Sequence, residues 1–185
     1  MKHPIAKLYT DHGMITMELY PEYAPNTVNS FIWAIHENMY VDRVIQRIVP
    51  GFVIQPTYDF SKEPECDMIL EGEFISNGFE NPIPFEKGIV AMAGDGDKEA
   101  HGCAFFITLA DDVKDRLQGR FAAFGRVIDG IEEVERLEQV SLEDVHVEGM
   151  SVVIKRPLKD EYIRKVEVET FGVEYPKPEI KRWGE

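Results

Sequence analysis

The sequence predicts a mainly β protein, a barrel-like domain with two helices packed against it. Three observations support this prediction. Short segments of alternating apolar and polar residues recur along the chain, glycine or proline interrupts most of them, and only two segments show helical spacing. Many short strands with few helices are typical of an antiparallel barrel. The length of 185 residues suits one domain with a sizeable core.

The charge and the cysteine content narrow the function classes. The chain carries 34 acidic and 20 basic residues, a net charge of −14. Proteins bind nucleic acid and anionic membrane surfaces through clustered Lys and Arg. Because this chain is strongly acidic, we expect neither as a partner. There is no signal-peptide pattern and no apolar run of membrane-spanning length, which predicts a cytoplasmic protein. Cys66 and Cys103 form no disulfide framework or C-x-x-C motif, so we expect no cofactor and no metal.

The first third of the chain predicts a hairpin followed by a helix. Residues 5–19 alternate on both sides of Asp11-His12-Gly13, which is typical of two half-buried strands joined at a turn. After Pro25, apolar residues recur at helical spacing up to Ile35. They predict a helix of about three turns with Asn26 as its candidate N-cap.

The middle of the chain predicts further strands separated by loops. Residues 43–55 predict two strands that meet at Pro50-Gly51. Residues 56–87 predict a long loop in which Phe79 and Phe85 fill the core. Further strands are expected at 88–93, 104–109 and 121–127, with polar loops at 94–102 and 110–120.

The last third predicts a second helix and a closing strand. Ile131, Val134 and Leu137 recur at helical spacing after Asp129-Gly130. Residues 140–160 contain two alternating segments, and residues 164–170 predict a final strand.

The segment RVIQRIVPGFVIQ, residues 43–55, resembles the signature of the cyclophilin-type peptidyl-prolyl cis–trans isomerases. In that signature an aromatic residue, His and Arg precede an apolar turn, which Phe, an apolar residue and Gln follow. Further segments resemble the family in the same order: HGMITMELYPEYAPNTVNSF, GIVAMAG, AFFITLAD, LQGRFAAFGRVIDG and RKVEVETFG. The resemblance implies a closed antiparallel eight-stranded barrel capped by two helices. It also implies a domain over residues 1–172, an insertion at 140–160 and a C-terminal tail at 173–185.

The resemblance implies an isomerase that binds proline-containing peptides or unfolded protein segments and assists protein folding. Arg47 matches the family's catalytic arginine. The matching substrate-binding residues are Phe52, Val53, Gln55, Ala93, Gly94, Ala104, Phe106, Leu117 and Phe121. Rotation about a peptide bond has a barrier of ~18–20 kcal/mol because resonance stiffens the bond. A guanidinium beside an apolar site stabilises the twisted amide as its nitrogen regains a lone pair.

The chain departs from the family pattern at several of these positions. Ile45-Gln46 replaces Phe-His before the arginine, and Pro56-Thr57-Tyr58-Asp59 intervenes where Gly-Gly-Asp is usual. Ala104, Gly94 and Phe121 stand where the family commonly has Gln, Asn and His or Tyr. Arg116 occupies the place of a tryptophan used to bind cyclosporin. These departures predict weakened or differently selective activity, and weak or no cyclosporin binding.

Two other functions compete with the isomerase. The first is a module of the same fold that binds proline-containing segments without useful turnover. The second is a hydrolase or transferase that uses Cys103 with His101, although two residues on one segment make a poor catalytic pair. Asp95, Asp97 and Glu99 alternate like the start of a calcium loop, but the loop lacks the required later glycine and glutamate.

Overall fold

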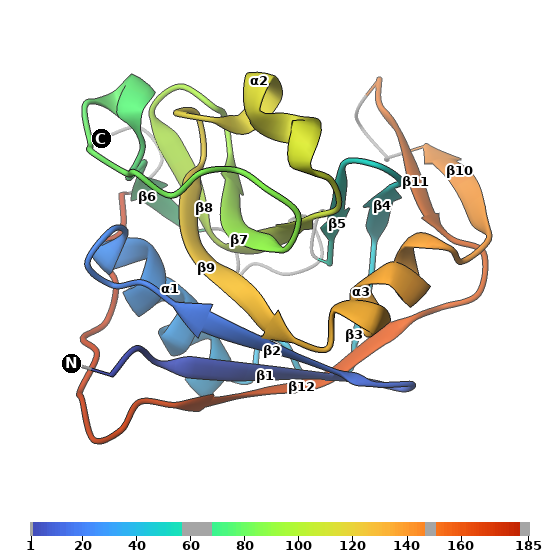
Figure 1. Ribbon diagram of the computed structural model, residues 1–185, viewed down its shortest axis with the longest axis horizontal. Coiled ribbons are helices and arrows are strands. Elements are labelled where there is room, and N and C mark those ends of the chain that lie inside the picture. The colour runs from blue at the N-terminus through green and yellow to red at the C-terminus, as the bar shows by residue number, and fades with distance from the viewer. Residues whose placement is uncertain (1, 57–67, 147–150, 182–185) are drawn as a thin grey trace.

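A computed structural model describes residues 2–56, 68–146 and 151–181. Figure 1 shows strands curling around one core, with α1 (Pro25–His36) and α3 (Ile131–Glu138) lying against them. The two predicted helices are therefore confirmed. Short helical segments add α2 (Lys114–Leu117), η3 (Ile75–Asn77) and η4 (Asp111–Val113). No helix in the described part of the chain is both long and apolar enough to cross a membrane.

The main sheet has ten antiparallel strands among the described residues. Along the sheet they are β3 (Arg43–Val44), β12 (Tyr162–Glu169), β1 (Ile5–Thr10), β2 (Met14–Leu19), β9 (Ala122–Asp129), β7 (Ile89–Gly94), β8 (Glu99–Thr108), β5 (Val53–Gln55) and β4 (Arg47–Val49). The tenth, β6 (Ile69–Glu71), pairs with β8 beside this path. The mainly β fold is confirmed, with ten strands in place of the eight expected.

The barrel is closed by the chain and not by a continuous ladder of hydrogen bonds. β3 and β4 are the two ends of the strand order, yet only Ile45 and Gln46 separate them in the sequence. The Ile45 N–H donates to the Glu161 carbonyl oxygen, and the Gln46 N–H donates to that of Pro56. The expected closed barrel is thus a strongly curled sheet whose ends meet at this linker. Arg47 is the first residue after it.

The core inside the curl comes from inward-facing residues of the strands and from α1. Phe31 of α1 contacts Phe105 and Phe124, with ring centroids 5.3 Å and 5.1 Å away. Phe74 is also buried there, whereas Phe79, expected in the core, is half-exposed. Phe85 is buried as expected. An aromatic residue in a loop gives no periodic signal for its burial. The sequence therefore suggested Phe79 for the core, where the structure has Phe74.

The N-terminus of α1 is held by a carboxylate from a distant loop. The Glu73 side chain accepts hydrogen bonds from the backbone N–H groups of Asn26 and Thr27 at 2.9 Å and 2.8 Å. Asn26 is therefore not the N-cap; that position belongs to Ala24, and Pro25 begins the helix. The Asn26 amide instead exchanges two hydrogen bonds with the backbone of Glu179. Glu73 satisfies N–H groups that the helix cannot satisfy itself.

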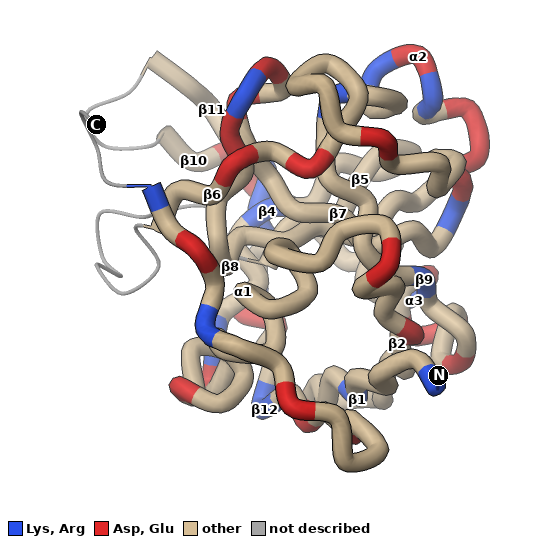
Figure 2. The backbone as a smooth tube through the Cα atoms, turned by 90° about the vertical axis from the view of Figure 1, so that its left-hand side faces the viewer, with Lys and Arg blue, Asp and Glu red and all other residues tan. Residues whose placement is uncertain are grey.

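Residues 140–160 contain a separate hairpin, β10 (Leu142–His146) and β11 (Val153–Pro157). It stands outside the ten-stranded sheet, with β11 beside β4 (Figure 1). The C-terminal segment folds back over the molecule, because the Lys181 N–H donates to the Ile69 carbonyl oxygen. Figure 2 shows acidic and basic positions interspersed over the surface elements, with both kinds at α2.

Two loop boundaries differ from expectation. The segment expected to be a loop at 56–87 contains β6, whose residues pair with 99–101 of β8. The polar loop expected at 94–102 ends early, because β8 begins at Glu99. β6 has only three residues and the start of β8 is polar, so neither gives a clear alternating pattern, and both are stabilised by pairing with a distant partner.

Candidate active site

The sheet is buried on both faces, and side-chain alternation divides its residues between two hydrophobic clusters. In β8, Cys103 and Phe105 belong to the inner core, whereas Ala104 and Phe106 belong to a second cluster. We call this second set the outer cluster. Its buried members are Val53, Ile83, Phe85, Ile89, Ala91, Ala93, Ala104, Phe106, Val113, Leu117 and Ala123, and its partly exposed members are Tyr20, Val49, Phe52, Ala110 and Phe121.

The outer cluster contains most of the predicted substrate-binding residues. Val53, Ala93, Ala104, Phe106, Leu117, Phe52 and Phe121 all belong to it. Three strands, β5, β7 and β8, the turn between β4 and β5, and the segment 110–121 bring them together. The sequence did not indicate the residues beneath and beside them, such as Ile83 and Val113, because apolar residues in loops carry no periodicity.

Three aromatic rings organise this cluster. Phe106 is 4% exposed and meets Phe121 edge to face, with ring centroids 5.7 Å apart. On its other side it stacks on Phe85 at 6.4 Å and an interplanar angle of 18°. Edge-to-face and stacked pairs add stability beyond the area that they bury. Phe106 is thereby fixed as a buried floor, with Phe52 and Phe121 half-exposed above it.

The side-chain amides of half-buried Gln118 and buried Asn81 hold residues 81–85 onto the cluster. Gln118 accepts a hydrogen bond from the Phe85 N–H at 2.9 Å and donates to the Ile83 carbonyl oxygen at 3.2 Å. Asn81 donates to the carbonyl oxygens of Glu73 and Ala123 at 3.1 Å and 2.8 Å. These bonds satisfy backbone groups that would otherwise be buried without partners. Residues 81–85 therefore form a fixed wall of the site.

Arg47 lies on the outer face of the sheet, beside the outer cluster. In β4 its side chain is on the same face as Val49 and opposite to the inward-facing Ile48. Its strand partner is Gln55, which is 6% exposed. Arg47 Nη1 donates to Gln55 Oε1 at 2.9 Å. The two polar residues thus lie together at one edge of an apolar surface.

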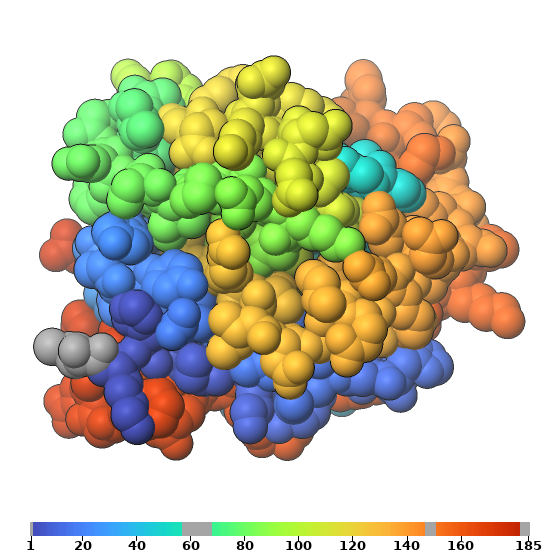
Figure 3. All heavy atoms as spheres, viewed as in Figure 1, coloured from blue at the N-terminus to red at the C-terminus, as the bar shows by residue number. Residues whose placement is uncertain are grey.

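Arg116 covers another part of the same surface. Its guanidinium carbon is 3.6 Å from the centroid of the Phe52 ring, within the range of a cation–π contact. Figure 3 shows the turn between β4 and β5, in cyan, exposed between the yellow segment that contains α2 and the orange α3. Phe52 belongs to this turn, and the Gly51 N–H donates to the Glu138 side chain of α3 at 2.7 Å.

Cys103 is not placed as a surface nucleophile would be. Its side chain is fully buried in the inner core, and its carbonyl oxygen accepts a hydrogen bond from the Tyr40 hydroxyl at 2.9 Å. In the loop that resembles a calcium site, Asp95 Oδ1 instead accepts the N–H groups of residues 97, 98 and 99. Within the described residues, no group of three or more His, Cys, Asp or Glu side chains is arranged to hold a metal ion.

The family model of the cyclophilin type peptidyl-prolyl cis-trans isomerase matches residues 5–168. The chain belongs to this family.

Curated relatives agree with the family model. A peptidyl-prolyl cis-trans isomerase-like 3 of Gallus gallus is 30% identical over 154 residues, 78% of this chain and 93% of that protein. A peptidyl-prolyl cis-trans isomerase-like 1 of Gibberella zeae is 31% identical over 161 residues, 83% of this chain and 94% of that protein. The isomerase CYP57 of Arabidopsis thaliana is 34% identical over 133 residues, 71% of this chain but only 26% of that longer protein.

Solved structures share the cyclophilin fold. A cyclophilin type isomerase of Cryptosporidium parvum gives a TM-score of 0.70 at 21% identity, over 92% of this chain and 99% of that one. Its structure in the presence of the dipeptide Ala-Pro gives a TM-score of 0.71 at 21% identity, over 90% and 99%. The likeness shows that the curled sheet and the helices described above are those of a cyclophilin.

Two departures from the cyclophilin pattern have structural consequences. A Cβ at Gly94 would lie 2.1 Å from the Glu99 carbonyl oxygen, so the asparagine common at this position does not fit the present backbone. A bulge between Met92 and Gly94 accompanies this close approach. Ala104 is fully buried and offers no side-chain hydrogen bond. The polar groups that many cyclophilins have at these two positions are therefore missing.

Proposed function

We propose that this cyclophilin catalyses cis–trans exchange of X-Pro peptide bonds, with Arg47 as its catalytic residue. The observation that supports this most directly is the position of Arg47. Its side chain lies on the outer face of β4, next to Val49 of the outer cluster, and donates to Gln55 at 2.9 Å. A guanidinium beside an apolar surface is the arrangement that the isomerisation chemistry requires.

The reaction breaks no bond, so the proposed mechanism is electrostatic. When the X-Pro bond twists, the proline nitrogen loses conjugation and regains a lone pair. An N–H group of Arg47 that points at this nitrogen binds the twisted form more strongly than the planar form, which lowers the barrier. The apolar neighbours strengthen such a hydrogen bond because they exclude water. About 4 kcal/mol of differential binding corresponds to a rate increase of roughly a thousandfold.

In this scheme the outer cluster binds the proline ring. Phe106 and Leu117 form an apolar floor, and Phe52 and Phe121 are half-exposed beside it. An apolar surface holds the ring while the preceding residue rotates, and Gln55 positions the arginine through its hydrogen bond. The Ala-Pro dipeptide in the Cryptosporidium structure supports a proline-bearing ligand here. We further propose that the natural clients are proline-containing segments of unfolded cytoplasmic proteins.

A binding module without useful turnover is the second candidate, and Ala104 and Gly94 favour it. With neither side chain offering a hydrogen bond, the substrate backbone is held by fewer polar contacts. Loose positioning lowers catalysis more than binding, because reaction requires a narrow range of geometries.

Exchange NMR separates these two functions. Amidated peptides that contain Ala-Pro are titrated with the protein, and both the chemical shifts and the cis–trans exchange rate are measured. An active isomerase raises the exchange rate far above the uncatalysed value of one event per tens to hundreds of seconds. Saturable shifts at the Ala-Pro resonances with an uncatalysed exchange rate would instead establish the binding module and refute the proposed activity.

A further inference from the structure

Two arginines beside the outer cluster differ from the arginines elsewhere on the surface. Four other arginines pair with carboxylates: Arg126 with Glu86, Arg136 with Glu133 and Glu161, Arg156 with Glu143, and Arg164 with Asp11 and Asp42. Arg116 and Arg120 form no such ion pair with any residue in the ranges that the structure describes. In a chain with 34 acidic residues, two exposed guanidinium groups that lack a carboxylate partner require an explanation.

Arg116 is held over the site by an aromatic ring. It immediately precedes Leu117 of the outer cluster, and its guanidinium carbon is 3.6 Å from the Phe52 ring centroid. Arg116 itself is exposed. Stacking on the ring face fixes the plane of the guanidinium and leaves its N–H edges available for a carboxylate.

Arg120 is held beside the outer cluster by a backbone hydrogen bond. It immediately precedes Phe121, and its Nε donates to the Gly96 carbonyl oxygen at 3.2 Å. Gly96 has φ +73°, and a Cβ there would lie 3.2 Å from Arg120 Nη2 and 3.4 Å from Phe121 Cζ. The guanidinium therefore lies beside the Phe121 ring, with two terminal nitrogens left for a ligand.

Two acidic side chains in the same loops accept hydrogen bonds from backbone N–H groups. Asp95 accepts three N–H groups of its own loop, and Asp111 accepts the Lys87 N–H at 2.9 Å. Neither carboxylate is paired with Arg116 or Arg120. Arg116 and Arg120 therefore keep N–H groups that a peptide carboxylate can bind.

We propose that Arg116 and Arg120 make this cyclophilin select proline segments that carry a carboxylate side chain within about three residues of the proline. This inference rests on the proposed function and names the substrate class of the same site. A net charge of −14 repels acidic peptides at long range, whereas the two arginines offer a peptide carboxylate direct contacts beside the site. Exposed ion pairs are individually weak, so we expect the two together to give a preference of about three- to tenfold for Glu over Gln.

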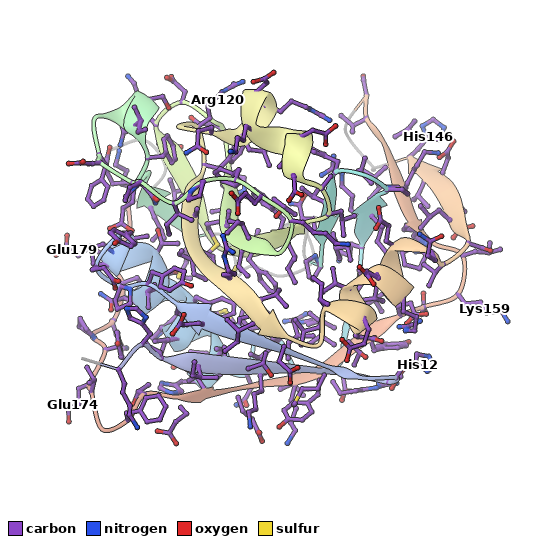
Figure 4. All side chains as sticks on the ribbon, in the orientation of Figure 1. His12, Arg120, His146, Lys159, Glu174 and Glu179 are labelled. Carbon is purple, nitrogen blue, oxygen red and sulfur yellow. The ribbon has the colours of Figure 1, made fainter. Side chains whose placement is uncertain are left out.

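The test uses amidated Ala-Pro peptides in which Glu, Gln or Lys occupies each of three positions on either side. The exchange rate and the Kd are measured by NMR for the wild type, Arg116→Gln, Arg120→Gln and the double variant. Lys159→Gln is the matched control, because it removes one positive charge at an exposed position far from Arg120 (Figure 4).

At one position or more, the wild type should turn over the Glu peptide about three- to tenfold faster than the Gln peptide at low salt. About 0.5 M salt should reduce this ratio below about twofold. Each arginine variant should lower the ratio about two- to threefold, the double variant should abolish it, and Lys159→Gln should keep it.

Equal kcat/KM and equal Kd for the Glu and Gln peptides at every position would overturn the proposal, as would a preference that survives in the double variant. Failure of the proposed function gives a different result. In that case none of the peptides exchanges faster with the protein than without it. The ratio of Kd values would then still decide whether the two arginines select acidic segments.

Discussion

Arg47 Nη1 donates a hydrogen bond to Gln55 Oε1 at 2.9 Å, and the two residues are directly opposite each other on β4 and β5. Gln55 is buried and Arg47 is half-buried. The register of one strand pair therefore sets where the proposed catalytic guanidinium lies relative to the outer cluster. Several predictions about catalysis and stability depend on this and on similar contacts.

Removing the acceptor should impair catalysis without unfolding the protein. In Gln55→Leu, Arg47 loses a bond that orients it, so kcat should fall about five- to tenfold while KM changes little. Gln55→Glu keeps an acceptor oxygen and should retain most of the activity. Wild-type kcat in Gln55→Leu, measured by exchange NMR, would show that Gln55 does not position the arginine.

Turnover should depend little on pH. Arg47 stays protonated throughout the accessible range. Burial raises the pKa of Asp95, but hydrogen bonds from backbone N–H groups outweigh it and hold the pKa below its usual value. Burial and a hydrogen bond to Glu18 raise the pKa of Tyr20 to about 12. We expect kcat/KM to vary by less than about twofold between pH 6 and 9, and a sharp bell-shaped profile would contradict the mechanism.

The ion pairs of Arg136 should contribute to stability in a pH-dependent way. Arg136 bonds Glu133 at 2.8 Å and Glu161 at 2.7 Å. Burial raises the pKa of Glu133, but hydrogen bonds from Arg136 and Thr10 outweigh it and leave the pKa lowered. A lowered folded-state pKa adds stability that is complete above the unfolded value of about 4.3 and is lost as the pH falls through the folded value.

The corresponding variant is Arg136→Met. It leaves two largely buried carboxylates without their partner, so the free energy of unfolding at pH 7 should fall by about 2–3 kcal/mol. Denaturant titrations at pH 7 and pH 3 should show a smaller loss at pH 3, because that pH lies below the unfolded-state pKa of about 4.3 for a glutamate. Arg156→Met removes a more exposed pair and should cost less than about 1 kcal/mol. A loss from Arg136→Met that is equal at both pH values would contradict the electrostatic account.

Glu73 should stabilise α1 from outside the helix. Glu73→Ala removes the acceptor of two N–H groups and of the Thr27 hydroxyl. The free energy of unfolding should therefore fall by about 1–2 kcal/mol. The measurement is the midpoint of denaturant unfolding. Glu80→Ala, at an exposed position of the same loop, should leave the midpoint nearly unchanged, and equal effects of the two variants would refute the capping role.

The strands and the two faces of the sheet were predictable because their signal is local. Alternation in 104–109 assigns Phe106 and Phe105 to opposite faces, as the structure shows. The family signature at 43–55 likewise led to the expectation that Arg47 and Gln55 both belong to the site.

Contacts between distant segments were not predictable from the same patterns. The Glu73 carboxylate contacts a helix 47 residues away in sequence, and no periodicity indicates such a pair. Arg116 was expected only to replace a tryptophan, and its stacking on Phe52 depends on how two loops meet. Side-chain packing between loops is set by tertiary structure, and propensity carries little information about it.

The central claim is that the Arg47 guanidinium stabilises the twisted amide. The most direct test compares the wild type with Arg47→Ala on one amidated Ala-Pro peptide by exchange NMR, with thermal unfolding measured for both. We predict that kcat/KM falls about a hundredfold or more in a variant that remains folded. Undiminished exchange by folded Arg47→Ala would contradict the account.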